Sequence, residues 1–245
     1  LWMSLRIVGA AVATPFGGPM SLINRIEAAL EQQFSRTRSI SAPPRLMEAM
    51  RHAVFPGGAR IRPQLCMAVA KACGEDDKGL TDAAAVAIEL LHCASLVHDD
   101  MPCFDDADLR RGQVTVHKQF GEPLALLTGD ALIIMAYQTL AHSGRQHPMR
   151  TVQLLSVISD GVGAPDGIVA GQAWECESRV ELSQYQRAKT GALFVAATCA
   201  GALAAGVDQA PWRKLGETLG EAYQVADDIR DVMMQADQLG KPAGQ

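Results

Sequence analysis

The residues of this chain best suited to chemistry are aspartates, gathered in two short clusters. The first cluster lies in LVHDDMPCFDDADLRRG (residues 96–112), which places five aspartates between Asp99 and Asp108 and then adds Arg110 and Arg111. Like charges packed this densely repel one another unless positive charge lies among them. A solvated acidic loop is the simplest interpretation of such a run, and a bound metal ion with its ligand is the alternative.

The second cluster favours the metal ion. In GEAYQVADDIRDV (residues 220–232), Gln224, Asp227 and Asp231 are spaced three and four residues apart and share one stripe of a helix, with Asp228 beside it. Carboxylates in a largely apolar helix need a counter-charge. Ligand sets made of oxygen alone suit Mg²⁺, which proteins hold with one or two carboxylates plus the phosphates of a substrate. The two clusters therefore predict a Mg²⁺ site for a phosphorylated molecule.

Positively charged side chains in the polar breaks between apolar segments are candidates for holding that molecule. Guanidinium and ammonium groups bind phosphate oxygens strongly, and the candidates are Arg60, Arg62, Arg110, Arg111 and Lys189. His92 and Ser95 precede Asp99 at helical spacing, so the three residues are expected on one helix face.

The elements that must position these residues are predicted to be helices. The 245-residue chain is 48% hydrophobic and only 5% aromatic, and its apolar residues recur at steps of three and four. Residues 81–101 form a long helix that Thr81 or Asp82 can cap and that leads into the first cluster, and residues 211–235 form the last helix. No alternating strand pattern stands out, so we expect one all-α domain of about ten helices.

Composition excludes several other classes. The net charge is −5 and no basic stripe is present, which argues against nucleic-acid binding. The six cysteines show no zinc-like spacing and predict a reduced, cytoplasmic setting. No uninterrupted apolar run reaches the roughly 18–20 residues that span a bilayer, so no stable membrane insertion is expected. Met20 looks like a natural start, so residues 1–19 are interpreted as a vector-derived or non-core extension before a domain over 20–245.

The ordered motifs resemble the trans-isoprenyl diphosphate synthases of the polyprenyl synthetase family. The motifs that carry the resemblance are GGARIRP, LLHCASLVHDDMPCFDDADLRRG, TVHKQFGE, TGDAL, AGQAWE, KTGALF, YQVADDIRD and GKPAGQ. The resemblance is closest to the bacterial members that make geranylgeranyl diphosphate. It implies the isoprenoid synthase fold, with helices around a central cavity, and a homodimer. The sequence stops before an aspartate expected after GKPAGQ, so the C-terminal part is expected to be missing.

The same resemblance implies a reaction and a role for each candidate residue. An allylic diphosphate (dimethylallyl, geranyl or farnesyl) ionises, isopentenyl diphosphate attacks the carbocation, and a proton is lost. Roughly three Mg²⁺ ions stabilise the leaving diphosphate. Asp99, Asp105, Asp227 and Asp231 are implied to face the Mg²⁺ ions, with Asp100 and Asp228 beside them; Arg110, Lys189 and Lys241 to contact the allylic diphosphate; Arg62, Arg111 and His92 to hold isopentenyl diphosphate; and Thr190 and Gln224 to point oxygens at the cation.

Two positions depart from the family pattern. Ala59 replaces a lysine that follows the glycine pair, which removes one cation from the isopentenyl diphosphate site. Neighbouring Arg60 is the candidate to compensate. Glu175 stands where a GQxxD pattern would place aspartate.

The length of the product is predicted from the small residues one turn before Asp99. Ala94 and Ser95 leave room for a growing chain, whereas a bulky aromatic side chain there would stop growth at fifteen carbons. We therefore expect geranylgeranyl diphosphate, with twenty carbons. Farnesyl or geranyl diphosphate synthesis, a terpene cyclase, and a weakly active or regulatory subunit of a heteromeric prenyl synthase are the alternatives.

Overall fold

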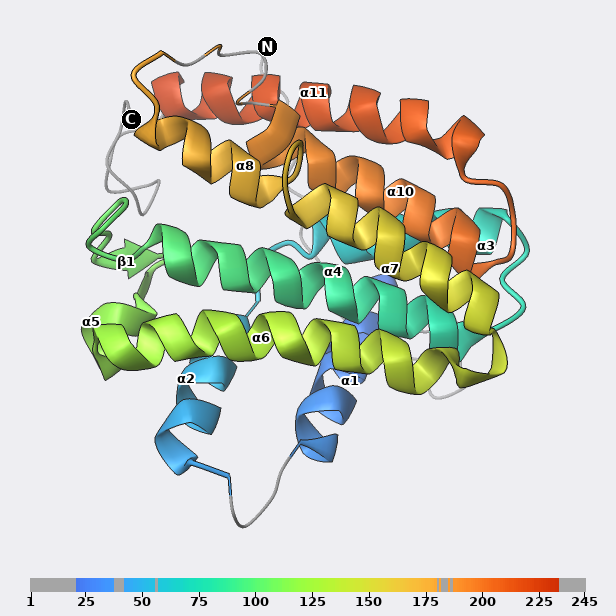
Figure 1. The fold of residues 1–245 in the computed structure, drawn as a ribbon, viewed down its shortest axis with the longest axis horizontal. Coiled ribbons are helices and arrows are strands. Elements are labelled where there is room, and N and C mark those ends of the chain that lie inside the picture. Colours follow the sequence, from blue (N-terminus) through green and yellow to red (C-terminus); the bar gives the residue numbers. More distant parts are fainter. Residues whose placement is uncertain are drawn as a thin grey trace, which may run out of the picture.

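The structure, a computed structural model, describes residues 21–37, 42–55, 57–179, 181, 185 and 187–233, with side chains described up to residue 229. Almost all regular structure in these residues is helical, which confirms the prediction of an all-α chain (Figure 1). The helices and helical turns are α1 (Leu22–Arg36), α2 (Pro44–Val54), α3 (Ile61–Ala72), α4 (Lys78–Asp99), α5 (Val116–Phe120), α6 (Glu122–Ser143), η1 (Gly144–Gln146), α7 (Pro148–Val162), α8 (Ile168–Ala173), η2 (Trp174–Cys176), η3 (Arg187–Gly191), α10 (Ala192–Ala204) and α11 (Ala210–Met233).

Helix α4 is the centre of the fold. It begins at Asp77, whose carboxylate caps the helix by accepting from the Leu80 N–H at 3.0 Å, rather than at the predicted Thr81 or Asp82. Thr81 is instead fully buried. The helix is lined by alanine and leucine on almost every side, and α6 lies alongside it (Figure 1). A helix that is apolar all round belongs in the core.

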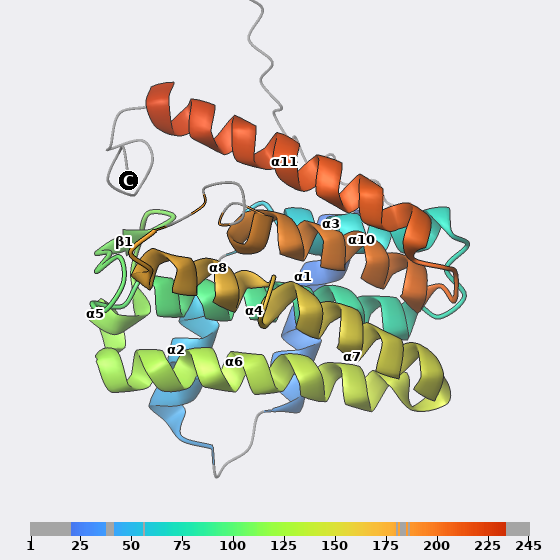
Figure 2. The same ribbon diagram turned by 45° about the horizontal axis from the view of Figure 1, so that its top comes forward.

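A second layer covers α4 from the other side. Helix α10 is almost entirely buried and packs against α3, α7, α4 and α11. Figure 2 shows α11 lying over α10 and running the length of the molecule. The first aspartate cluster follows α4 and the second lies on α11, and α10 packs against both of these helices.

One short hairpin follows α4 and was not predicted. Strands β1 (Leu109–Arg110) and β2 (Gln113–Val114) pair antiparallel, with Leu109 opposite Val114. Arg111 and Gly112 form the two-residue turn with φ of 54° and 78°, which is the geometry that matches the twist of a tight hairpin. Two strands of two residues each are too short to leave an alternating pattern in the sequence.

Two helices in the described part of the chain are long and apolar enough to cross a membrane by length and composition alone. They are Lys78–Asp99, whose apolar window is 78% buried inside the protein, and Glu122–Gln146, whose window is 44% buried. The sequence did not reveal them as uninterrupted apolar runs because one or two charged residues interrupt the apolar stretch of each helix. Such windows also occur in core helices, so they are weak evidence for a membrane span.

Candidate active site

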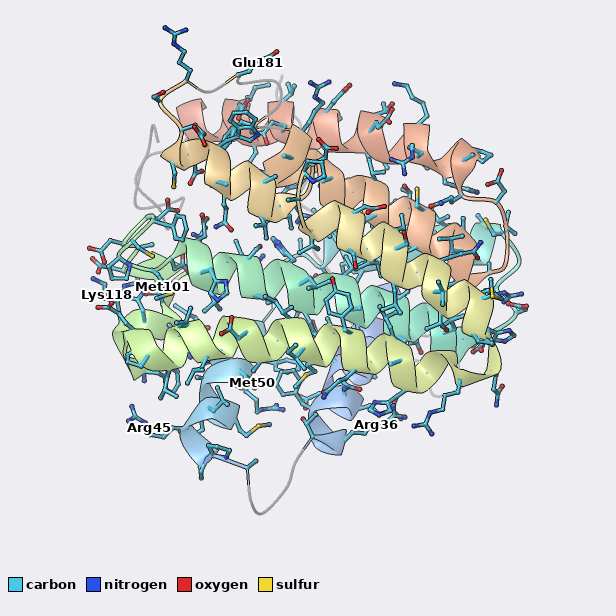
Figure 3. The ribbon with its side chains drawn as sticks, in the orientation of Figure 1. Arg36, Arg45, Met50, Met101, Lys118 and Glu181 are labelled. Carbon is cyan, nitrogen blue, oxygen red and sulfur yellow. The ribbon has the colours of Figure 1, made fainter. Side chains whose placement is uncertain are left out.

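The first aspartate cluster divides into an inner and an outer group. After α4 the chain folds back on the end of the helix, because the Asp105 N–H donates to the Asp99 carbonyl at 3.0 Å. Asp106 and Asp108 face outward, where both carboxylates lie 3.1 Å from the Lys118 ammonium. Figure 3 labels Met101 and Lys118 at this end of the molecule.

The inner group surrounds Arg110. The Arg110 guanidinium bonds Asp100 through Nε at 2.8 Å and through Nη2, and it lies 3.6 Å from both Asp99 and Asp105. Burial raises the pKa of Asp100 even though Arg110 opposes this, and burial together with Asp99 raises the pKa of Asp105. Arg110 thus lies within 3.6 Å of three crowded carboxylates, although the sequence predicted a metal ion as their counter-charge.

Lys189 supplies a second cation to Asp99. It lies in η3, a π-helical turn, and its Nζ is 3.4 Å from Asp99 Oδ1 and closer still to Glu175 Oε1. Burial lowers the pKa of Lys189, but Asp99 and Glu175 outweigh it and raise the pKa overall. Gln172 completes the contacts of Asp99 by donating to Oδ1 at 3.0 Å. Thr190, the next residue, is half-buried.

A separate cationic cluster is formed by Arg62 and Arg111 around His92. Arg62 and Arg111 both approach Nε2 of His92, at 3.4 and 3.3 Å. Burial and these two guanidiniums hold the pKa of His92 well below its usual range, so the ring is neutral and Nε2 accepts. The buried Nε of Arg62 has no hydrogen-bond partner among the described residues. Two converging guanidiniums with an unsatisfied N–H are suited to a bound anion.

The aromatic side chains of α10 and α11 hold Arg62 in place. Its guanidinium carbon lies 4.8 Å from the centre of the Phe194 ring and 5.7 Å from that of Tyr223. Gly58 allows Arg111 to approach from the other side, since a Cβ at that position would lie 2.5 Å from the Arg111 guanidinium carbon. Arg62, His92 and Arg111, which the resemblance grouped together, are therefore adjacent.

Arg60 does not belong to this cluster, which corrects the expectation that it compensates for Ala59. Its side chain is 1% exposed and bonds Glu27 at 2.7 Å, Glu89 at 2.6 Å and the Val54 carbonyl at 2.8 Å. These three partners occupy the guanidinium donors that a diphosphate would need. Ala59 itself is exposed, so the missing lysine is not replaced by its neighbour.

The second cluster lies on α11, where only part of it is described. Asp227 and Gln224 are half-buried, and Asp227 raises the pKa of the Arg62 guanidinium, although burial, the largest effect, lowers it overall. The Gln224 amide donates to Asp228 at 2.7 Å. Asp231 belongs to α11 but its side chain lies outside the described residues, and so does Lys241 altogether.

A groove between α7, α10 and α11 has a volume of about 1230 Å³ but is a different place. It is lined by Trp174, Arg187 and Glu217 among others, and it includes Gln224 and Asp228. None of the inner aspartates and none of Arg62, His92 and Arg111 lines it. Asp228 therefore faces this groove, which separates it from Asp227.

The two residues predicted to set product length lie in different surroundings. Ala94 is 1% exposed and packs in the core. Ser95 is half-buried, and its hydroxyl donates to the His92 carbonyl at 2.8 Å. The face of α4 that carries Asp99 and His92 is thus continued by Ser95 rather than by Ala94.

The inner aspartates suit a Mg²⁺ ion that is held jointly by one or two carboxylates and the phosphates of a substrate. Among the described residues, no group of three or more acidic, histidine or cysteine side chains forms a metal cage by itself. The donors present are carboxylate oxygens already paired with Arg110 and Lys189, so they would bind a cation that arrives with phosphate oxygens of its own. Asp99 and Asp105, which both lie 3.6 Å from Arg110, are the candidates to hold it.

The comparisons with known proteins identify the family. The polyprenyl synthetase family matches residues 43–245, and the chain belongs to that family. It is 56% identical to the geranylgeranyl diphosphate synthase of Cereibacter sphaeroides and 54% identical to that of Rhodobacter capsulatus, in each case over 92% of this chain and 78% of the relative.

Solved structures confirm the fold. A geranyltransferase from Legionella pneumophila is 33% identical with a TM-score of 0.77, covering 86% of this chain and 77% of its own. A FPP/GFPP synthase from Zymomonas mobilis is 34% identical with the same TM-score, covering 87% and 82%. The predictions of the family and of the isoprenoid synthase fold are therefore confirmed.

Proposed function

We propose that this chain is a prenyltransferase that joins isopentenyl diphosphate head-to-tail to allylic diphosphates and ends at geranylgeranyl diphosphate. The observation that carries the proposal is the presence of two cationic clusters with different surroundings. Arg110 and Lys189 lie among carboxylates, whereas Arg62 and Arg111 converge on a neutral His92. A reaction between two diphosphates, of which only one must leave, needs this asymmetry.

The carboxylate-rich cluster is the proposed site of the allylic diphosphate. Asp99 and Asp105 would hold Mg²⁺ against its oxygens, and the metal would supply positive charge as the carbon–oxygen bond breaks. Arg110 and Lys189, each within 3.6 Å of Asp99, would turn from the carboxylates to the diphosphate when it binds. Asp227 on α11 would face the same ions from the opposite side.

The second cluster is the proposed site of isopentenyl diphosphate. Arg62 and Arg111 would bind its phosphates, and His92 keeps both guanidiniums in place without adding charge. The double bond of this substrate attacks the allylic cation, and the departing diphosphate takes the proton that is lost. Because no covalent intermediate with the protein is needed, the buried cysteines have no part in this scheme.

Three further features remain proposals of the same kind. A cytoplasmic location follows from the cysteine pattern. A homodimer follows from the resemblance and is supported by the outer face of α6, where Leu126, Leu127 and Ile134 are each about half exposed, at 49%, 51% and 57%. The twenty-carbon product is supported by the small side chain of Ser95.

One assay tests the function. The purified protein is incubated with Mg²⁺, isopentenyl diphosphate and farnesyl diphosphate, and the products are separated by chain length. Formation of geranylgeranyl diphosphate that stops when Mg²⁺ is chelated is the expected result. Diphosphate release into a hydrocarbon without elongation would identify a terpene cyclase. Inactivity that a partner synthase relieves would identify a regulatory subunit.

A further inference from the structure

Lys189 contacts Glu175 as well as Asp99, and Glu175 is in turn hydrogen-bonded to Tyr185. Glu175 follows α8 in the turn η2, and its Oε1 is the closest neighbour of the Lys189 ammonium. The Tyr185 hydroxyl donates to the same oxygen at 2.6 Å. The Lys189 ammonium also lies 5.5 Å from the centre of the Tyr185 ring. Tyrosine, glutamate and lysine thus form one connected set that ends at Asp99.

The backbone of this region is built to bring the set together. Gly171 in α8 packs directly on η3, because a Cβ there would lie 2.5 Å from the Lys189 amide nitrogen. The next residue, Gln172, donates to Asp99 at 3.0 Å. The same short segment therefore orients the carboxylate through Gln172 and the ammonium through Glu175. A π-helical turn such as η3 is rare and is frequently found at functional sites.

A glutamate is needed for this bridge. Its carboxylate accepts from Tyr185 and from Lys189 at a single oxygen, and an aspartate would be one methylene group shorter. Burial and the bond to Glu175 raise the pKa of Tyr185 to about 12, so the hydroxyl remains a donor at neutral pH. The ring and the hydroxyl of Tyr185 thus confine Glu175 to one orientation, and Glu175 confines the ammonium.

We infer that Tyr185 and Glu175 are positioning residues that hold the Lys189 ammonium beside Asp99, where the allylic diphosphate is to bind. The inference rests on the proposed function, because it takes Lys189 as a ligand of that diphosphate. Without the pair, the ammonium would move fully onto Asp99 and occupy a carboxylate that the metal ion needs. Binding of the allylic substrate would weaken, while the cluster of Arg62, His92 and Arg111 would be untouched.

The test is a double-mutant cycle read through two Michaelis constants. Tyr185→Phe and Glu175→Gln are each expected to raise the KM for farnesyl diphosphate about threefold to tenfold, the effect of one hydrogen bond, with the KM for isopentenyl diphosphate unchanged. The double variant should raise the KM for farnesyl diphosphate no more than Glu175→Gln alone does, because Tyr185 acts only through Glu175. Glu175→Asp should resemble Tyr185→Phe.

Two further variants make the result decisive. Tyr137→Phe is the matched control, since its hydroxyl contacts Ser159 at 3.2 Å on the far part of α6, and it should change neither constant. Lys189→Ala should raise the KM for farnesyl diphosphate more than any of the others. The positioning role of Tyr185 and Glu175 is refuted, and the role of Lys189 is kept, in either of two cases. In the first, Lys189→Ala raises this KM but Tyr185→Phe does not. In the second, the effects of Tyr185→Phe and Glu175→Gln on this KM add in the double variant. If Lys189→Ala leaves that KM unchanged, the proposed role of Lys189 fails as well.

Discussion

Two arginines separated by one residue show how burial decides what a charged side chain can do. Arg60 and Arg62 flank Ile61 at the start of α3, and the motif alone makes them equivalent. Arg60 is enclosed by Glu27 and Glu89, which satisfy its charge. Arg62 is stacked on aromatic rings that leave its Nε unpaired. Only the second has donors left for an anion, and no local sequence signal separates the two.

Ala59 gives a prediction at the same scale. The residue is exposed and follows Gly58, on which Arg111 packs, so a lysine here would add a third cation near Arg62 and Arg111. Ala59→Lys is expected to lower the KM for isopentenyl diphosphate about threefold to tenfold, in line with one charge-assisted hydrogen bond. Steady-state kinetics with farnesyl diphosphate held saturating measures it. Ala59→Gln serves as the uncharged control, and an equal effect of both variants would contradict the electrostatic explanation.

His92 gives a prediction about pH. Because the pKa of His92 is lowered in the folded protein, the unfolded chain binds a proton first as the pH falls below about 6.5. Stability is therefore retained above that pH and is lost below it, by at most about 1.4 kcal/mol per pH unit for one group. Asp100 and Asp105 act in the opposite direction, because their raised pKa values make the folded protein bind protons before the unfolded chain as the pH falls.

Urea unfolding between pH 7.5 and 5.5 measures this effect. The free energy of unfolding of the wild-type protein should fall as the pH falls. In His92→Gln, the part of this pH dependence that comes from His92 should be absent. If the free energy of unfolding depends on pH equally in both proteins, His92 is not held neutral by Arg62 and Arg111.

At the scale of elements, the proposed path of the growing chain depends on which residues of α4 share a face with Asp99. Asp99, His92 and Ser95 lie on that face, and Ala94 lies on the packed side with 1% exposure. The sequence spacing showed that Ser95 shares a face with Asp99, but it could not show which neighbouring position is covered by other helices. That depends on α6 and α10, which are distant in sequence.

Ser95 and Ala94 can be told apart by substitution. Ser95→Phe is expected to shift the main product from twenty toward fifteen carbons, because the ring would fill the space continuing from the Asp99 face. Ala94→Phe is expected to lower the free energy of unfolding by about 1–3 kcal/mol through overpacking of the core. Product analysis by chain length and urea unfolding of both variants check this. An unchanged product in Ser95→Phe would place the tail of the chain elsewhere.

At the scale of the whole molecule, the helical architecture followed from composition and periodicity, because long apolar helices leave a strong signal. The site followed only partly. The aspartates and the Arg62, His92 and Arg111 set came from ordered motifs, whereas Gln172 and Tyr185 were missed. Gln172 lay inside a motif already noted, but nothing in its spacing linked it to Asp99, since that contact joins α8 to α4 across the fold.

The outer face of α6 gives a prediction for the assembly. Leu127 and Ile134 lie seven residues apart on one side of the helix and are both more than half exposed. Ile134→Asp is expected to convert a dimer into a monomer, measured by sedimentation at micromolar concentration. Val152→Asp on α7 is the matched control because Val152 is 59% exposed outside that face. A dimer that survives Ile134→Asp would locate the interface elsewhere.

The hairpin turn at Arg111 and Gly112 has a consequence for reading variation in this chain. Arg110 lies among the aspartates and Arg111, in the turn, lies beside His92, so two neighbouring residues have the surroundings proposed here for two different substrates. Substitution of Arg110 should therefore raise the KM for the allylic diphosphate, whereas the same substitution of Arg111 should raise the KM for isopentenyl diphosphate. Loss or gain of one residue within the turn should displace Arg111 from His92 while Arg110, which precedes the turn in β1, keeps its contact with Asp100, so the length of this hairpin matters for only one of the two arginines.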